Sequence, residues 1–256
     1  DRPDQTESAS IVPTGWLQIE AGVLRESSEE KYPHYSSSGY STLTEEYTSL
    51  QLPGVLVRLG LNEQMELRIG VGYINDKFSI ASRDLTQTRQ GFDAFSLGTK
   101  VAVSEEDGLI PQSAILAALT IPGTGAKHFE SEWLVPEIRF AFAHTLSDRF
   151  SFGYNIAAMW DGESARHIGY YSFVIGAGLV YDVSCFAEVY GELPGDTYPL
   201  HRFDAGLTWL ITNDLQLDAS YGIGLTDPAN DMKGMPFAYA MESFVSAGVS
   251  WRVPLW

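Results

Sequence analysis

The chain has 256 residues, of which 45% are apolar and only 19% charged, and its formal net charge is -17. This acidic balance argues against a nucleic-acid partner, because phosphate binding needs a basic face, and the single cysteine, Cys185, excludes an internal disulfide framework and a cysteine-based zinc site. The 24 glycines and the many aromatic residues favour an all-β protein. No apolar run reaches the roughly 18 residues that indicate a transmembrane helix, but a transmembrane β-barrel stays open because its apolar residues alternate with polar ones.

Residues 1–14 form a polar leader. Its first eight residues, DRPDQTES, contain three acids, one arginine and one proline, but no large apolar residue. Composition alone would indicate a disordered tail. The leader runs directly, however, into GWLQIEAGV, whose alternation is typical of a strand. No signal peptide is present, which indicates either a cytosolic protein or a chain that begins after cleavage.

About twelve stretches then show the period-two alternation of strands. In MELRIGVGY, for example, Leu67, Ile69 and Val71 share one face, while Glu66 and Arg68 share the other. The stretches span residues 15–24, 48–61, 65–75, 92–104, 112–122, 133–146, 149–160, 169–182, 184–193, 201–212, 214–226 and 243–253.

The connections between these stretches alternate between short and long. Short ones lie at residues 62–64, 105–111, 147–148, 183 and 212–214, and longer polar ones at 25–47, 75–91, 122–132, 161–168, 194–200 and 226–241. Successive connections of an antiparallel meander lie at opposite ends. The pattern therefore predicts the asymmetry of outer-membrane barrels, with short periplasmic turns, longer extracellular loops and both termini at the periplasmic end.

The alternative is a soluble β-sandwich, but its strands usually have about 5–6 residues and both of its inner faces are apolar. Here many stretches approach the roughly 9–11 residues that a tilted strand needs to cross a bilayer. One face carries large apolar and aromatic residues, and the other carries glycine, serine and charges. We therefore predict an all-β fold, a transmembrane antiparallel up-and-down β-barrel of about 12 strands over residues 15–256.

The last stretch ends on an aromatic residue, Trp256, as outer-membrane barrels commonly do. Trp256 is one residue out of phase with Trp251. A bulge at Pro254, which cannot donate a ladder hydrogen bond, is expected to restore the register.

The start of the chain carries motifs of one outer-membrane family. The matching residues are Asp1, Arg2, Pro3, Asp4, Thr6, Glu7 and Ser8, then Val12, Pro13 and Gly15 in a V-P-x-G turn, and Leu17, Gln18, Glu20 and Gly22 in an L-Q-x-E-x-G strand. This opening resembles the family of outer-membrane transporters of the meta-pathway of phenol degradation. The motifs cover about the first tenth of the chain, and the length, strand number and terminal aromatic agree. The resemblance implies passage of small, aromatic or hydrophobic molecules across the outer membrane of a Gram-negative bacterium.

The polar parity of the strands predicts a charged lumen, because the apolar parity would face lipid. The inward candidates are Glu20, Arg58, Glu66, Arg68, Lys100, Glu137, Arg139, Glu188, Asp204, Asp218 and Arg252, with Asn155 and Gln216 on the same parity. Two interpretations stay open. The charges could be scaffold ion pairs that fill a closed lumen, or they could set the selectivity of a narrow channel.

We predict that the leader is an ordered plug or latch in this lumen. Arg2 is expected near lumen acids, and Asp1, Asp4 or Glu7 near one of the lumen arginines Arg58, Arg68, Arg139 or Arg252. Inward glycines such as Gly248 would either leave space for a substrate or a plug, or ease strand curvature.

The predicted function is a passive channel for a small molecule, without catalytic residues, cofactor or metal, and its signal peptide is expected to have been removed. A different class is a non-transporting accessory subunit with a sealed lumen, and a third is a lipid hydrolase built on His144, for which no matching outward serine is apparent. The expected partners are outer-membrane lipid and lipopolysaccharide, a small-molecule substrate and other envelope proteins. Acids in the first long connection (Glu29, Glu30, Glu45 and Glu46) are interpreted as a solvated loop rather than a cation site.

Overall fold

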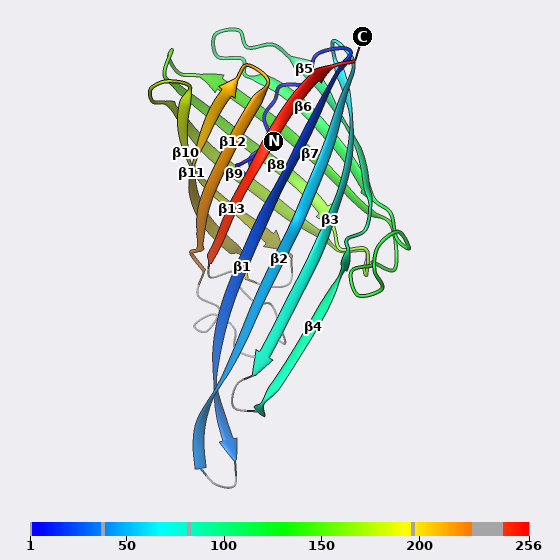
Figure 1. Ribbon diagram of the computed structural model, residues 1–256, viewed down its shortest axis with the longest axis vertical. Coiled ribbons are helices and arrows are strands. Elements are labelled where there is room, and N and C mark those ends of the chain that lie inside the picture. The colour runs from blue at the N-terminus through cyan, green and yellow to red at the C-terminus, as the bar shows by residue number, and fades with distance from the viewer. Residues whose placement is uncertain (1, 37–38, 81–82, 196–197, 227–242, 256) are drawn as a thin grey trace.

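The computed structural model is a closed antiparallel β-barrel (Figure 1). It describes residues 2–36, 39–80, 83–195, 198–226 and 243–255. Within these residues the strands are β1 (Trp16–Ser36), β2 (Gly39–Asn62), β3 (Met65–Ile80), β4 (Leu85–Phe92), β5 (Ser96–Ser104), β6 (Gln112–Thr120), β7 (Val135–Thr145), β8 (Phe150–Trp160), β9 (His167–Gly178), β10 (Val183–Pro194), β11 (Leu200–Thr212), β12 (Leu215–Gly224) and β13 (Ser243–Pro254). No helix in the described part of the chain is long and apolar enough to span a membrane.

Twelve of these strands make the ring. Each pairs with its neighbours in sequence, β13 pairs with β1, and β2 pairs with β3, so the sheet closes on itself. The remaining strand, β4, pairs with β3 beyond the part of β3 that pairs with β5. The predicted fold class, an up-and-down barrel of about 12 strands, is confirmed.

The barrel is apolar outside and polar inside. Large apolar side chains on the outward parity are exposed, among them Ile156 at 58% and Phe173 at 47%. On the inward parity, Glu66, Lys100 and Asp204 are 0% exposed. Lipid on the outer face would cover the apolar side chains, whereas a sandwich would bury them.

The two ends of the ring differ as predicted. The tight turns β2–β3, β7–β8 and β11–β12 lie at one end, which we call the short-turn end, and the longer connections lie at the other, the long-loop end. The C-terminus is at the short-turn end, while the N-terminal leader turns back into the ring (Figure 1).

The predicted loop at residues 25–47 is wrong, because β1 and β2 continue through it as one paired hairpin that projects beyond the ring (Figure 1). Its polar composition suggested a loop, but its threonines and tyrosines also favour extended pairing. The acids assigned to a solvated loop, Glu29, Glu30, Glu45 and Glu46, therefore lie on paired strands, with Glu29 opposite Glu46 and Glu30 opposite Glu45.

The predicted loop at 75–91 is likewise replaced by the end of β3 and by β4. The expected bulge at Pro254 is not seen, since β13 pairs with β1 in continuous register as far as Trp16 and Pro254. Trp256 lies outside the described residues.

Candidate functional site

The predicted lumen charges lie inside the ring. No more than 9% of the surface of each of the following is exposed: Glu20, Arg58, Glu66, Arg68, Lys100, Glu188, Asp204 and Asp218. Burial of so many charges is costly unless they are paired and hydrogen-bonded. The ion pairs and hydrogen bonds that offset this cost are formed partly by other wall residues and partly by the leader.

An ion network joins β1, β2 and β3 on the inner wall. Arg58 binds Glu66 at 2.8 Å and Glu20 at 3.1 Å, and Arg68 binds Glu66 at 3.1 Å. The strand register brings these residues together, because Arg58 is the cross-strand partner of Arg68, while Glu66 is the cross-strand partner of Lys100. The Glu66 carboxylate thus lies among three buried cations and holds their like charges together.

The leader enters the lumen along this network. The amide of Val12 donates to Glu66 Oε2 at 2.7 Å. Lys100 Nζ donates to the carbonyl oxygens of Ser8 at 3.0 Å and Ser10 at 3.3 Å. The Glu7 carboxylate pairs with Lys100 at 3.1 Å and also with Arg68.

The middle of the leader is hydrogen-bonded to β8, β9 and β10. The Asn155 side-chain amide accepts from the Glu7 amide at 2.7 Å and donates to the Glu7 carbonyl at 2.9 Å, as a neighbouring strand would. Thr6 Oγ1 donates to Ser172 Oγ at 2.7 Å and also contacts Glu188.

The start of the leader is held by β1, β12 and β13. The Arg2 amide donates to Glu20 Oε2 at 3.0 Å, and its guanidinium donates to Asp218 Oδ1 at 3.0 Å and Ser246 Oγ at 2.8 Å. From Val12 back to Arg2 the leader therefore contacts β3, β5, β8, β9, β10, β12, β13 and β1, and so follows the inner wall around the barrel.

Two glycines make room for the Arg2 side chain. A Cβ atom on Gly248 would lie 2.1 Å from Arg2 Nε, and one on Gly22 would lie 2.4 Å from Arg2 Cζ. Of the two alternatives considered for the inward glycines, space for the leader explains these positions.

Gly248→Ala should displace Arg2 and loosen the leader while the barrel stays folded, because the three atoms nearest to the added Cβ all belong to the flexible Arg2 side chain. Loss of the Arg2 contacts should weaken leader binding by about 1–3 kcal/mol, roughly a 5- to 150-fold larger released population. The rate of cleavage after Glu7 by a glutamate-specific protease measures this population. Gly178→Ala is the control, because a Cβ atom added there would lie 3.9 Å from the nearest heavy atom, the Arg149 carbonyl oxygen. Equal cleavage rates in both variants would contradict the assignment.

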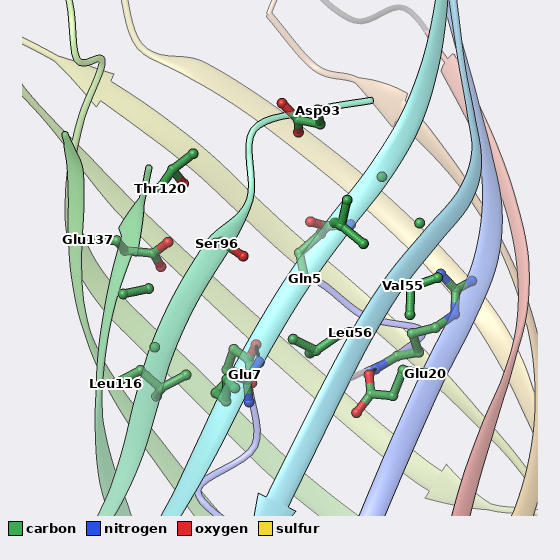
Figure 2. Close-up of a pocket in the computed structure, with 18 of the residues that line it drawn as sticks. Gln5, Glu7, Glu20, Val55, Leu56, Asp93, Ser96, Leu116, Thr120 and Glu137 are labelled. Carbon is green, nitrogen blue, oxygen red and sulfur yellow. Dashed lines mark hydrogen bonds and ion pairs between the residues drawn. The ribbon is translucent and has the colours of Figure 1, made fainter. Parts of the chain in front are cut away.

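Two cavities flank the leader. One of about 580 Å³ lies toward the long-loop end, and its wall includes Leu56, Leu116 and Met159. The other, of about 260 Å³, lies toward the short-turn end. Figure 2 shows the larger cavity, with Leu56 and Leu116 from the wall and Gln5 and Glu7 from the leader. Arg2 lines both cavities, so the leader lies between them.

Of the other predicted residues, Arg139 donates to the Gln5 carbonyl at 3.1 Å and so also contacts the leader. Glu137 lines the larger cavity and pairs with Arg139 at 2.9 Å. Arg252 lies near the short-turn end and donates to the Asn213 carbonyl at 2.7 Å. His144 lies on β7 with its ring 6.2 Å from that of Tyr154.

Arg2 pairs with a lumen acid, and Glu7, one of the three acids expected near an arginine, pairs with Arg68. Asp4 has a different environment. Its strongest charged neighbour is the Glu188 carboxylate rather than an arginine. Asp1 lies outside the described residues. Sequence reasoning did not assign Thr6, Ser172 or Ser246 to the site. Their parity could have indicated Ser172 and Ser246, but nothing in the pattern distinguishes them from other inward serines.

The sequence was compared with protein families and curated proteins. The sequence model of the family described as "Putative MetA-pathway of phenol degradation" matches residues 1–235. No curated protein matches the chain.

Solved structures with a similar fold are outer-membrane barrels. An outer membrane channel from Pseudomonas putida F1 has a TM-score of 0.64 at 12% identity, with 99% of this chain and 100% of that chain covered. The translocator domain of the autotransporter NalP from Neisseria meningitidis has a TM-score of 0.56 at 10% identity, covering 94% and 90%. The NanC porin has a TM-score of 0.51 at 11% identity, covering 93% and 100%. At these identities the likeness concerns the fold, which is that of an outer-membrane β-barrel.

Proposed function

The chain belongs to the MetA-pathway phenol-degradation family, and we propose that it is a passive outer-membrane channel for small, neutral aromatic or other hydrophobic molecules. The observation that carries the proposal is the cavity of about 580 Å³ inside the barrel, bounded on one side by the leader. Its volume lies within the roughly 300–1,000 Å³ of small-molecule sites. In this proposal the long loops are extracellular, the short turns and the C-terminus are periplasmic, and the leader enters the lumen from the periplasmic end.

The chemistry of the cavity supports a hydrophobic substrate. Leu24 and Met159 line it and also pack against a cluster that contains the buried rings of Tyr170, Tyr190 and Phe244. The Arg139 guanidinium lies over the Tyr170 ring, 4.7 Å from its centre, and so covers one face of that ring. A small neutral aromatic molecule would find apolar contacts at Leu24, Leu116 and Met159, next to charged groups such as Glu7 and Glu137 that also line the cavity.

The leader would act as the barrier below this cavity. Its backbone and side chains are hydrogen-bonded to strands all around the ring. A substrate that entered from the long-loop end would therefore meet the leader before it reached the smaller cavity. Passage would require the leader to shift, or a narrow path beside it.

Proteoliposomes test the proposal. Uptake of phenol should exceed that of an uncharged sugar and that of empty liposomes, since the aromatic molecule can bury its ring against the apolar part of the wall, which includes Leu116 and Met159. Leu116→Asn, which places an amide on the cavity wall, should slow phenol uptake severalfold. Leu119→Asn is the matched control, because Leu119 lies on the same strand but is 44% exposed on the opposite face.

The second candidate is a sealed accessory barrel, and the dense bonding of the leader favours it. The two candidates predict different results in the same liposomes. If neither phenol nor ions cross the membrane, even after the leader is removed, the channel proposal is wrong and the sealed barrel is favoured.

A further inference from the structure

Two buried carboxylates face each other on β10 and β11. Glu188 and Asp204 are directly opposed in the strand register, and they are 1% and 0% exposed. Both point into the lumen at the level of the leader. Like charges directly opposite on neighbouring strands repel, and more strongly inside a protein than in water.

The leader adds a third carboxyl to this pair. The Gln5 amide donates to Glu188 Oε2 at 2.7 Å, and Thr6 also contacts Glu188. This contact brings the preceding residue, Asp4, close enough for its charge to act on both Glu188 and Asp204. No described residue gives either carboxylate oxygen of Asp204 a hydrogen bond.

The neighbouring cations are engaged elsewhere. Arg2 pairs with Asp218, Arg139 with Glu137 and Arg202 with Glu192. The titratable and charged groups that face the three carboxyls from the surrounding elements are Arg2 and Glu7 of the leader, Glu20 of β1, Arg139 of β7, Tyr170 of β9, Tyr190 of β10, Arg202 of β11 and Asp218 of β12.

Three carboxyls without a cation cannot all be ionised at low cost, so they hold a proton among them. A shared proton also supplies the donor that Asp204 lacks. We propose that Asp4, Glu188 and Asp204 form a proton-dependent latch, which holds the leader in the lumen while they share a proton and releases it when that proton is lost.

The direction in which pH shifts the position of the leader follows from the pKa of Asp4. Burial and the Glu188 carboxylate raise the pKa of Asp4 well above its ordinary value while the leader is seated. A group whose pKa is raised in one state binds its proton more tightly in that state. Seating of the leader is therefore favoured at pH values below the raised pKa of Asp4 and weakens as the pH rises through it. Glu7 acts in the opposite direction, but only in acid below its ordinary pKa of 4.5, because Lys100 and Arg68 lower the pKa of Glu7 in the seated leader to about 2. The latch can regulate transport only if the barrel is the proposed channel. The position of the leader, however, can be measured without transport.

A nitroxide spin label reports that position. The label is attached at Ser10→Cys in a Cys185→Ser background, because the Ser10 side chain is exposed and accommodates it. In the full-length barrel in liposomes, the ratio of mobile to immobile label should rise with pH, by at most about tenfold per pH unit for one linked proton. A ratio that does not change with pH overturns the latch.

Asp204→Asn removes one charge and should keep the label immobile at the pH values that release it in the wild type. Glu192→Gln is the matched control, because it removes a carboxylate from the same strand as Glu188 but one that pairs with Arg202, and it should titrate as the wild type does. Asp4→Asn tests the same charge from the leader side if Asp204→Asn does not fold. Titration of either variant like the wild type contradicts the proposal. Phenol uptake in the same liposomes is scored separately, so failure of the latch and failure of the channel remain distinguishable.

Discussion

Removal of residues 1–12 should raise the single-channel conductance in planar bilayers several-fold. The leader lies between cavities of about 580 and 260 Å³ and lines both. Its loss would join them into one water-filled path, because a twelve-stranded ring is wider than the eight-stranded barrels that side chains alone can fill. Conductance at fixed salt measures the change directly.

Gln5→Ala is the matched control for this deletion. The Gln5 side chain is exposed, and the leader is held at this position by the Gln5 backbone, whose amide binds Glu188 and whose carbonyl accepts from Arg139. Its conductance should equal that of the wild type. An unchanged conductance in the deletion variant would mean that the wall itself closes the lumen and that the leader is no barrier.

Glu66→Ala should lower the free energy of unfolding by about 3–5 kcal/mol, the usual cost of removing one partner from a buried ion pair. Glu66 is 0% exposed and binds Arg58 at 2.8 Å and Arg68 at 3.1 Å. Its loss leaves buried guanidinium groups close together and also removes the acceptor for the Val12 amide. Urea unfolding in liposomes, followed by tryptophan fluorescence, gives the free energy.

Glu137→Ala provides the comparison for Glu66. Glu137 pairs with Arg139 at 2.9 Å, but its side chain is 31% exposed. Water can solvate both groups of a partly exposed ion pair when the pair is broken. The free energy of unfolding is therefore expected to fall by at most about 1 kcal/mol. If the free energy of unfolding falls equally in the two variants, the buried network around Glu66 stabilises the barrel no more than the partly exposed Glu137–Arg139 pair does.

The strand stretches of the ring could be read from the sequence because alternation has the period of the strand itself. Leu67 and Ile69 had to share one face and Glu66 and Arg68 the other, whatever the neighbouring strands were. The same parity placed Lys100, Glu188 and Asp204 inside. It could not show where β1 and β2 end, because polar residues such as those of their hairpin occur both in loops and in extended pairs.

Alternation and composition were enough to predict a barrel with a polar interior, its inward charges and a leader suited to a polar environment. The wall residue that each leader group contacts became known only from the folded barrel. Arg2 binds Asp218 and Ser246, which are more than two hundred residues away in sequence, and Asp4 lies beside acids, whereas Glu7 pairs with Arg68. The physical reason is that periodicity specifies the face on which a side chain lies, whereas its partner depends on the closure and register of the ring and on the path of the leader within it.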